Sequence, residues 1–424
     1  MKVLVIGSGG REHAIVATLQ RTSSQRLEVF CAPGNAGIEQ IANCVEIKPN
    51  DIQSLADFSA EENIDLTIVG PEAPLAAGIV NTFEDRGLRI IGPSREAARL
   101  EASKAFAKDF MKRHGIPTAA YRTLESADDA LAVLQSGEFG GEDSPIVIKA
   151  DGLAAGKGVI VAQSRREAEA AVRELVTGSI SDAARKIVIE DALSGPEVSL
   201  LLFADGRDFR LMPAARDHKR LGENDTGPNT GGMGSITDKS ILDASELNEI
   251  VRTIIQPTLA GARAEGFGFR GVLFIGLMMT HNGPRVLEYN VRFGDPETQA
   301  ILVRLNSDLV EICEAIVSGR LGEMEVGWSE KSSACVVLAA RGYPAKPEIG
   351  ARIDGLDAVH RNVSIFHAAT QRQDSKWVTS GGRVLGVTSL GNTLDEALST
   401  CYGAVAGIHW EGMQFRRDIG RGHG

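Results

Sequence analysis

The stretch that decides the fold is Ile146-Val-Ile-Lys-Ala-Asp-Gly-Leu-Ala-Ala-Gly-Lys-Gly-Val-Ile-Val161. An apolar, β-branched run leads to a lysine, a glycine-rich segment follows, and a second apolar run closes the unit. Two such runs predict a hairpin with a flexible, cationic tip. The unit holds two lysines and three glycines: Lys149, Lys157, Gly152, Gly156 and Gly158. Because glycines let backbone N–H groups approach an anion and lysines add charge, the hairpin is typical of a lid over nucleotide phosphates.

Taken alone, this stretch leaves an alternative open. Its spacing is not that of a P-loop, because no hydroxyl residue follows Lys157 and no helix is predicted to begin there. A mobile surface hairpin with an ordinary lysine content also fits, since glycine-rich turns are common. The rest of the chain has to decide between the two interpretations.

Composition limits the possible functions. The chain has 424 residues, a formal net charge of −11 and 43% hydrophobic residues, and this length suggests roughly three domains. The acidic balance argues against coating nucleic acid, so a local cationic pocket must hold any anionic substrate. The five cysteines are scattered without a C-x-x-C pair, which indicates reduced thiols rather than a disulfide frame or a zinc site. No signal peptide and no membrane-spanning stretch are predicted, so we expect a cytoplasmic protein.

The first hundred residues alternate strands and helices. Strands are predicted at Lys2–Ile6, Leu27–Phe30, Leu66–Val69 and Arg89–Ile91, and a helix at Glu12–Leu19. This alternation predicts a parallel sheet whose binding crevice lies at the carboxyl ends of its strands. The turns that follow these strands are therefore candidate site residues.

The elements predicted downstream are less regular. In order they are a helical linker at 101–124, a helix at Ser126–Leu134, the hairpin, a helix that Ser164-Arg-Arg-Glu167 caps and that runs to about Val176, a strand at Lys186–Ile189, strands at Ala334–Ala340 and Gly382–Thr388, and a helix capped by Thr393-Leu-Asp-Glu396. The character of the chain changes after Gly327, which suggests a separate, strand-rich end.

Three more strings narrow the interpretation. They are Val5-Ile-Gly-Ser-Gly-Gly-Arg-Glu-His13, Asp217-His-Lys-Arg-Leu-Gly-Glu-Asn-Asp-Thr-Gly-Pro-Asn-Thr-Gly-Gly-Met-Gly234 and Leu287-Glu-Tyr-Asn-Val-Arg-Phe-Gly-Asp-Pro-Glu-Thr-Gln299. With the hairpin, the chain resembles the ATP-grasp superfamily and, within it, the phosphoribosylamine–glycine ligase (glycinamide ribonucleotide synthetase) family, from residue 1 to about 420. The resemblance implies an α/β and α+β multidomain protein with three parts: an N-terminal parallel-sheet (Rossmann-like) substrate-binding domain at 1–103, a central ATP-grasp domain at 104–325 with a lid subdomain at about 120–192, and a small strand-rich domain at 326–424.

The resemblance also implies a reaction. An ATP-dependent ligase of this family joins glycine to 5-phosphoribosylamine and gives glycinamide ribonucleotide, ADP and phosphate in purine biosynthesis. Glycine would first take the γ-phosphoryl group to form glycyl phosphate, and the amine would then displace phosphate. Phosphoryl transfer needs mainly positioning and charge neutralisation. We expect small-molecule partners only, no nucleic acid, and a monomer.

An acceptor site is predicted after the first strand. Gly7-Ser-Gly-Gly10 is close to a dinucleotide fingerprint, but Glu12 stands where the third glycine belongs. Backbone N–H groups at the start of the following helix could still donate to a phosphate monoester. By resemblance, the phosphoribosylamine crevice comprises Gly9, Gly10, Pro71 and Glu72. Tight turns that serve packing alone are the alternative.

The ATP site is assigned by resemblance. Lys104 and Lys149 would reach the α- and β-phosphates, and Gly156, Lys157 and Gly158 belong to the lid. Glu190 and Leu193 would pair with the adenine edge through the backbone, and Glu197 would accept hydrogen bonds from the ribose hydroxyls, for which an ionised carboxylate is suited. A solvated acidic turn is the alternative for residues 190–197.

A metal site is predicted where Glu288 and Asn290 flank Tyr289 on a strand, so that both side chains lie on one face. Such oxygen ligands suit Mg²⁺ or Mn²⁺. Arg292 follows on the same face and could hold a carboxylate or phosphate bidentately. Together with Lys149 and Asp295 it makes up the predicted catalytic set. A solvated polar face is the alternative, but the surrounding sequence is apolar.

The long loop at 217–234 is expected to supply further substrate contacts. These are Asp217, His218, Lys219, Asn229, Gly231 and Gly232, together with Arg292. His218 could act as a general base, although a lone histidine in a polar loop more often positions or packs. After Gly234 the chain is shorter than is usual in the family, which leaves the role of that part open.

Three other functions are compatible with parts of the sequence. Another ATP-grasp ligase of the purine pathway, a carboxylase or a formate-using enzyme, shares the central motifs. An NAD-dependent oxidoreductase could use the first domain, but Glu12 argues against it. A non-catalytic nucleotide-binding regulator is disfavoured by the intact set of Lys149, Glu288, Asn290 and Arg292.

Overall fold

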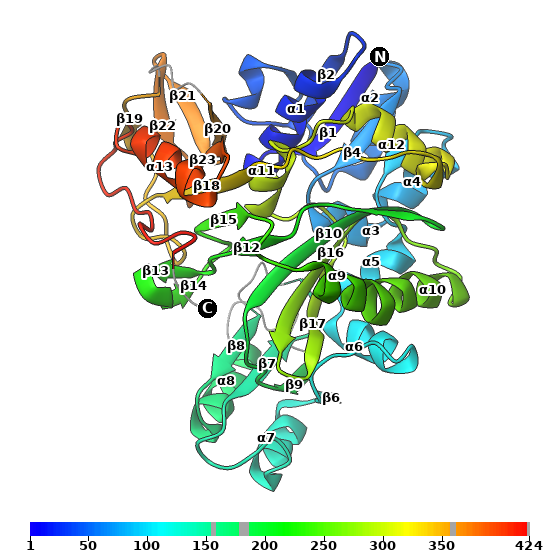
Figure 1. The fold of residues 1–424 in the computed structure, drawn as a ribbon, viewed down its shortest axis with the longest axis vertical. Helices are drawn as coiled ribbons and strands as arrows, with labels where there is room; N and C mark the ends of the chain where they lie inside the picture. Colours follow the sequence, from blue (N-terminus) through cyan, green and yellow to red (C-terminus); the bar gives the residue numbers. More distant parts are fainter. Residues whose placement is uncertain (154–157, 178–185, 357–361, 422–424) are drawn as a thin grey trace.

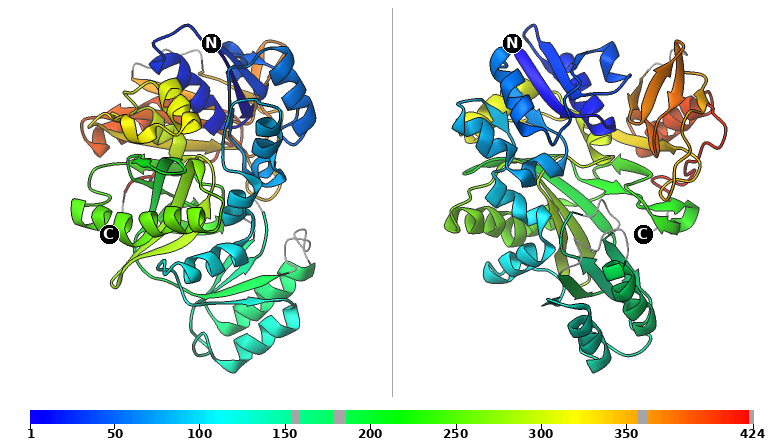
Figure 2. Two further views of the ribbon diagram at one scale, coloured as in Figure 1. Left: turned by 90° about the vertical axis from the view of Figure 1, so that its right-hand side faces the viewer. Right: turned by 180° about the vertical axis from the view of Figure 1, so that it is seen from behind.

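The computed structural model describes residues 1–153, 158–177, 186–356 and 362–421. Figures 1 and 2 show a parallel sheet and the C-terminal strands at one end of the molecule, a long central sheet, and a small sheet with two helices at the other end. Gly156 and Lys157 lie outside the described residues, as does most of the hairpin tip, so the predicted lid motion is not addressed.

The first sheet is parallel, as the sequence predicts. It has the strand order β3-β2-β1-β4-β5. Its strands are β1 (Lys2–Gly7), β2 (Glu28–Pro33), β3 (Asn43–Cys44), β4 (Leu66–Val69) and β5 (Ile90–Ile91). The helices around it are α1 (Gly10–Thr22), α2 (Ile52–Glu61), α3 (Glu72–Ala77), α4 (Ile79–Asp85) and α5 (Arg95–Ala102). Apolar runs such as β1 are buried on both faces, which is usual in parallel sheets. The turns after β1 and β4 are neighbours, so they open on one crevice.

The small sheet contains the hairpin and is antiparallel. Its order is β6-β9-β7-β8, with β6 (Tyr121–Leu124), β7 (Ile146–Ala150), β8 (Val159–Ala162) and β9 (Ile187–Asp191). The predicted hairpin is confirmed, because β7 and β8 pair with Lys149 opposite Val159. Helices α7 (Ala127–Ser136) and α8 (Arg165–Thr177) pack together beside it.

One predicted element is wrong in part. The helical linker expected at 101–124 is helical only at 101–102, where α5 ends, and in α6 (Lys104–Arg113), and residues 121–124 form β6. The helix ends because Gly115 adopts a left-handed φ of 65° and Pro117 follows shortly after it. Beyond them, β6 pairs with β9, which supplies the hydrogen bonds that a helix would have satisfied internally.

The central sheet runs through the molecule and includes the C-terminal strands. Its order is β17-β16-β10-β12-β15-β18-β23-β20, with β11 (Phe209–Leu211) beside β10. The strands are β10 (Glu197–Asp205), β12 (Ala215–Asp217), β15 (Gly234–Thr237), β16 (Arg270–Thr280), β17 (Gly283–Asn290), β18 (Ser332–Ala339), β20 (Val363–His367) and β23 (Arg383–Gly391). Because β15 pairs with β18, one sheet crosses the domain boundary proposed at 325/326. The short segment after Gly234, whose role the sequence leaves open, is strand β15.

The remaining elements surround these sheets. They are β13 (Arg220–Gly222), β14 (Thr226–Asn229), β19 (Arg352–Ile353), β21 (Thr370–Gln373), β22 (Lys376–Thr379), α9 (Ala244–Ile250), a π-helical turn (Val251–Ile255), α10 (Gln256–Ala264), α11 (Glu297–Leu302), α12 (Leu309–Ser318), α13 (Leu394–Val405) and 3₁₀ turns at Ile38–Gln40, Glu223–Asp225 and Leu321–Glu323. The predicted cap of α13 is confirmed, since the Thr393 hydroxyl accepts a hydrogen bond from the Glu396 N–H at 3.2 Å. Among the described residues, no helix is both long and apolar enough to cross a bilayer.

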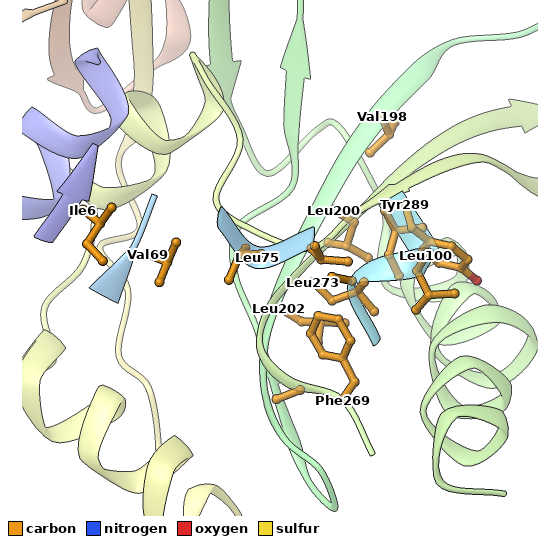
Figure 3. Close-up of a cluster of buried hydrophobic side chains, with 14 of the residues drawn as sticks. Ile6, Val69, Leu75, Leu100, Val198, Leu200, Leu202, Phe269, Leu273 and Tyr289 are labelled. Atoms are coloured by element: carbon orange, nitrogen blue, oxygen red, sulfur yellow. The ribbon is translucent and has the colours of Figure 1, made fainter. Parts of the chain in front are cut away.

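A hydrophobic core joins the first sheet to the central one. All six of Ile6, Val69, Leu75, Leu200, Leu202 and Leu273 are buried members of one hydrophobic cluster, and Figure 3 shows Leu75 between the first two and the leucines of β10 and β16. Burying one such side chain is worth roughly 1.5–3 kcal/mol. This shared core fixes the crevice of the first sheet relative to strand β17.

Candidate active site

The predicted metal pair lies at the end of strand β17. Glu288 and Asn290 share one face, and Tyr289 between them points the other way, where its hydroxyl bonds to Thr258 at 2.7 Å. The alternation expected from the sequence is therefore confirmed. Tyr289 is 2% exposed, so its packing holds the two oxygen-bearing side chains on the site face.

Cations surround Glu288. Burial alone would raise the pKa of its carboxyl, but the positive charges of Lys219, Lys149 and Lys104 outweigh burial and hold the pKa below its usual value. No hydrogen bond or ion pair joins the Glu288 side chain to another residue that the structure describes. The carboxylate is thus ionised, partly accessible and open to a ligand.

Glu190 has an unexpected partner set. Its carboxylate pairs with Lys149 at 2.8 Å and with Lys108 at 2.7 Å, all three side chains being nearly buried. Burial, followed by repulsion from Lys149, lowers the pKa of Lys108 to about 8. The sequence analysis missed Lys108, although its spacing of four residues from Lys104 on a helix places both on one face. The side chain of Glu190 therefore holds lysines, and its backbone lies in strand β9 between β6 and β7, at the end of the strand that leads to Leu193.

The base of the hairpin is tied to the start of α6. Lys104 donates to the Gly152 carbonyl at 2.7 Å, and the Asp151 carboxylate accepts from the Ala105 N–H at 3.1 Å. At the other end of the tip, the Gly158 carbonyl accepts from the Ala150 N–H at 2.8 Å. These contacts place Lys104 beside the base of the hairpin tip, and its contact with ATP phosphates stays a prediction.

Residues 193–219 border the same space. Leu193 is half-buried after β9, and Glu197 begins β10 with an exposed side chain. The Glu197 carboxylate pairs with Lys219 at 2.9 Å. Burial would lower the pKa of Lys219, but Glu197 and Glu288 outweigh it and raise the pKa. Lys219 therefore stays protonated. Its positive charge acts on both Glu197, the expected ribose contact, and Glu288 of the metal pair.

Arg292 is held by internal partners. Its guanidinium pairs with Glu101 at 2.9 Å and with Glu72 at 3.3 Å, and it also donates to Asn290 at 3.2 Å and to the Phe293 carbonyl. Glu101, which the sequence analysis missed, is buried and also accepts from the Val291 N–H at 2.7 Å. The expected bidentate grip on a substrate would require Arg292 to release a partner. In the structure it holds Asn290 of the metal pair and the crevice residue Glu72.

Asp295 meets a residue from the C-terminal strands. Arg383, another residue that sequence analysis missed, pairs with its carboxylate at 3.1 Å and also donates to the Gly231 carbonyl. Burial would raise the pKa of Asp295, but Arg383 outweighs it and holds the pKa below its ordinary value. A strand beyond residue 326 thus fixes both Asp295 and the glycine-rich loop.

Two carboxylates, the buried Glu297 and the half-buried Asp217, repel each other. Burial raises the pKa of Asp217 well above its usual value, and the charge of Glu297 raises it further; burial also raises the pKa of Glu297. Gly232 must lack a side chain here, because at its φ of 109° a Cβ would lie 2.7 Å from Asp217 Oδ1. Glu297 accepts from Ser199 at 3.1 Å. Sequence analysis found Asp217 and Gly232 but missed Glu297, which lies in the quoted string.

His218 and Asn229 make contacts within the protein, and their predicted substrate contacts stay predictions. The Nε2 atom of His218 accepts from the Gly420 N–H at 3.0 Å, and its Nδ1 atom lies 3.3 Å from the Gly234 carbonyl. Burial lowers its pKa to about 4, so it is neutral and packs the C-terminal tail. Asn229 sits on the exposed β13–β14 hairpin opposite Arg220.

In the acceptor crevice, one backbone N–H group that was expected to bind phosphate already has a partner within the protein. The Gly9 N–H donates to the Glu12 carboxylate at 2.6 Å, so it is not available to a phosphate. Glu12 is 2% exposed and also pairs with Arg11. The Glu12 side chain fills the space between the turns after β1 and β4, since a Cβ on Gly70 would lie 2.0 Å from the Glu12 Oε1 atom. Gly10 and Pro71 stand at the starts of α1 and α3, as expected.

The chain matches known families along its length. Family models for the N domain, the ATP-grasp (A) domain and the C domain of phosphoribosylglycinamide synthetase match residues 1–101, 102–298 and 333–422. A phosphoribosylamine–glycine ligase from Escherichia coli O6:H1 is 49% identical over 99% of this chain and 98% of its own length. The solved structure of a phosphoribosylamine–glycine ligase from Thermotoga maritima has a TM-score of 0.84 at 35% identity, covering 99% of this chain and 100% of that one. A biotin carboxylase from Campylobacter jejuni shares the fold, with a TM-score of 0.73 at 14% identity over 98% of this chain and 92% of that one.

Proposed function

The chain belongs to the phosphoribosylglycinamide synthetase family, and from that membership we propose how its residues divide the reaction among three adjoining sites. It is an ATP-dependent ligase that joins glycine to phosphoribosylamine in purine biosynthesis, and it uses ATP together with a divalent metal. The sites are one for ATP and metal, one for glycine and one for the acceptor amine.

The ATP site is centred on Glu288, and the cations around this one accessible carboxylate carry the proposal. Lys104 and Lys149 hold the phosphates, the backbone of residues 190–193 pairs with the adenine edge, and Glu197 accepts from the ribose. Lys108 and Glu190 keep Lys149 in place.

Glu288 and Asn290 fit a divalent cation of the Mg²⁺ type. The described residues contain no cluster of three or more acidic, His or Cys ligands, so phosphate oxygens and water would complete the coordination, as Mg²⁺ prefers. Such an ion supplies neutralisation of the phosphate charge. We propose Mg²⁺, with Mn²⁺ as the alternative to be compared in the assay.

The glycine site uses Asp217 and Glu297. Their raised pKa values express the cost of burial and of repulsion between the two acids, and an ammonium group between them would relieve that cost. Glycine held in this way directs its carboxylate to the γ-phosphorus. A carboxylate oxygen bonds to phosphorus, the bond to the β-bridging oxygen breaks, and glycyl phosphate and ADP result.

The acceptor amine then attacks the carbonyl carbon of glycyl phosphate. The new C–N bond forms, the C–O bond to phosphate breaks, and the proton that the amine loses passes to the departing phosphate. Asp295 has a lowered pKa and therefore stays ionised, so it accepts a hydrogen bond from the amine and orients it. Holding both reactants aligned can supply roughly 7–11 kcal/mol of the barrier.

An ADP-release assay tests the function. ADP should form with ATP, glycine and phosphoribosylamine together, and mass spectrometry should detect glycinamide ribonucleotide. Formate or bicarbonate in place of glycine should give no product above background. Product with either of them, and none with glycine, would indicate another ligase of the purine pathway. We also propose that the protein is a monomer, which sedimentation of the same sample tests. We further propose that the protein acts in the cytoplasm.

A further inference from the structure

The C-terminal tail, residues 416–420, lies against the glycine-rich loop at 217–234. Arg416 contacts the hairpin of β13 and β14, and only 2% of its side chain is exposed. Its guanidinium pairs with Asp225 at 2.6 Å and donates to the Arg220 carbonyl at 3.2 Å. One side chain of the tail therefore holds both a strand of the hairpin and the turn between its strands.

Asp418 extends this contact. Its carboxylate accepts two hydrogen bonds from Arg416, at 2.8 and 2.7 Å, and a third from the Asn224 N–H at 2.7 Å. A bidentate pair between arginine and a carboxylate fixes geometry as well as charge. The tail and the hairpin are therefore joined by a connected set of charged hydrogen bonds.

The end of the tail meets both ends of the loop. The Gly420 N–H donates to the Nε2 atom of His218 at 3.0 Å. Ile419 is fully buried, and a Cβ on Gly234 would lie 2.8 Å from its Cδ1 atom. The His218 N–H in turn donates to the Gly234 carbonyl at 2.9 Å. The tail thus packs where the loop begins and where it ends.

His218 stands between two residues that the proposed reaction uses. Asp217, which we propose for glycine, accepts from the His218 N–H at 2.7 Å. Lys219 follows it, and the Lys219 carbonyl accepts from the Thr230 N–H at 2.8 Å. A shift of His218 would therefore move the carboxylate of Asp217 and the ammonium group of Lys219 together. A displacement of about 1 Å can cost roughly a hundredfold in rate, even when it begins far from the reacting atoms.

Helix α13 supports the tail independently of the loop. The Tyr402 hydroxyl donates to the Arg416 carbonyl at 3.0 Å and accepts from the Ile419 N–H at 3.1 Å. The backbone of the tail is therefore anchored to α13, while the side chains of Arg416 and Asp418 face the hairpin.

We propose that Arg416 is a positioning residue for glycine binding: it holds the C-terminal tail against the loop and thereby fixes Asp217 and Lys219. The inference rests on the proposed function. It assigns a role in substrate binding to a segment about 200 positions away from Asp217 in the sequence, through the contacts between the tail, the hairpin and His218.

Hydrogen exchange followed by mass spectrometry tests this contact without any activity assay. Arg416→Met keeps most of the bulk of the side chain but removes its hydrogen bonds. We expect peptides from 217–234 to exchange at least about tenfold faster in this variant, because each 1.4 kcal/mol of lost local stability gives about a tenfold change. Peptides from β1 should exchange as in the wild type, which shows that the fold is retained.

The neighbouring arginine is the matched control. Arg417 is 73% exposed and makes one ion pair, with Glu223 at 3.4 Å, among the described residues. Arg417→Met should leave exchange in the loop unchanged, since exposed pairs contribute little. Arg416→Lys keeps the charge but has fewer donors than arginine, so its exchange should lie between that of Arg416→Met and that of the wild type.

Kinetics connects the contact to glycine. In Arg416→Met we expect the KM for glycine to rise at least about tenfold, while the KM for phosphoribosylamine stays within about twofold of the wild type. A partial return of the glycine KM in Arg416→Lys supports a positioning role, because a smaller fraction of folded enzyme would lower kcat and leave both KM values unchanged.

Three results would overturn the inference. They are unchanged exchange in the loop of Arg416→Met, equally faster exchange in β1, and an unchanged KM for glycine in a folded variant. The first would mean that the tail does not hold the loop, the second that Arg416 serves global stability, and the third that the loop does not need the tail to bind glycine. Absence of ligase activity in the wild type would reject the proposed function instead, and the exchange experiment would still decide whether the tail holds the loop.

Discussion

The Nζ atom of Lys149 lies 2.8 Å from the Oε1 atom of Glu190, with both side chains at most 8% exposed. A second buried lysine, Lys108, shares that carboxylate at 2.7 Å. One negative charge therefore faces two positive charges before any nucleotide arrives. Because an unbalanced buried charge is costly, a phosphate group at this position, where we propose that ATP binds, would offset the excess positive charge.

Replacing Glu190 tests this balance. In Glu190→Gln the two lysines would face each other without a carboxylate, and we expect the free energy of unfolding to fall by about 3–5 kcal/mol. Urea unfolding followed by circular dichroism measures the change. Glu197→Gln is the control, since its pair with Lys219 is about half exposed and its loss should cost about 1 kcal/mol or less. A similar fall in the free energy of unfolding for the two variants would contradict the assignment of Glu190 as the shared partner of Lys108 and Lys149.

Replacing Glu288 separates chemistry from folding. Glu288→Gln keeps the size of the side chain but removes the charge that the surrounding lysines face. We expect ADP release at saturating Mg²⁺ to be abolished, while the Tm stays close to that of the wild type because no described residue bonds to this side chain. Activity near the wild-type level would show that the metal pair is assigned to the wrong residues.

Local patterns in the sequence predicted much of this site. The alternation of Glu288 and Asn290 on β17, the hairpin that contains Lys149 and the capped helix α13 follow from neighbours within a few residues, and the structure confirms each of these elements. The family, the fold class and the ligase activity are confirmed by the comparisons.

The missed residues depend on distant pairing. Arg383 reaches Asp295 across 88 positions, because β23 joins the central sheet through β18. Lys108 meets Glu190 only when α6 packs beside β9. Such contacts follow from sheet order, which periodicity alone does not contain. The contact between Glu12 and the Gly9 N–H could have been predicted from the sequence, since a glutamate at the third helical position often caps the start of a helix.

A buried histidine predicts acid sensitivity. The Nδ1 atom of His13 accepts from the His367 N–H at 2.9 Å, and burial lowers the pKa of His13 to about 4. The unfolded chain binds a proton on this ring below about pH 6.5. Since the folded pKa is the lower one, the stability from neutral His13 is present above pH 6.5 and is lost as the pH falls toward 4. The loss is on the order of 3 kcal/mol.

His13→Gln should weaken this pH dependence, because glutamine can accept the same hydrogen bond without titrating. The free energy of unfolding, measured between pH 6.5 and 4.5, should fall less steeply in the variant than in the wild type. His281→Gln is the control, since His281 is exposed on the turn between β16 and β17. An unchanged slope in His13→Gln would assign the acid sensitivity to other groups.

The final prediction concerns the order of the chemical steps. Asp217 and Glu297, which we propose for glycine, share the charge of Lys219 with Glu288 of the proposed ATP site, whereas the acceptor crevice is formed by the turns after β1 and β4. Activation can therefore precede attack by the amine. With ATP labelled by ¹⁸O at the β–γ bridge, and with glycine but no phosphoribosylamine, the label should scramble into non-bridging β positions. Scrambling also needs free rotation of the ADP β-phosphate, so a second measurement is paired with it.

That second measurement follows glycine labelled with ¹⁸O in its carboxylate through full turnover. Amide formation through glycyl phosphate must move one carboxylate oxygen to inorganic phosphate, because the C–O bond to phosphate is the one that breaks. We expect one labelled oxygen in each phosphate released. Transfer without scrambling would mean that activation waits until the acceptor amine is bound. Absence of the label from phosphate during full turnover would rule out the acyl-phosphate route, whatever the scrambling experiment gives.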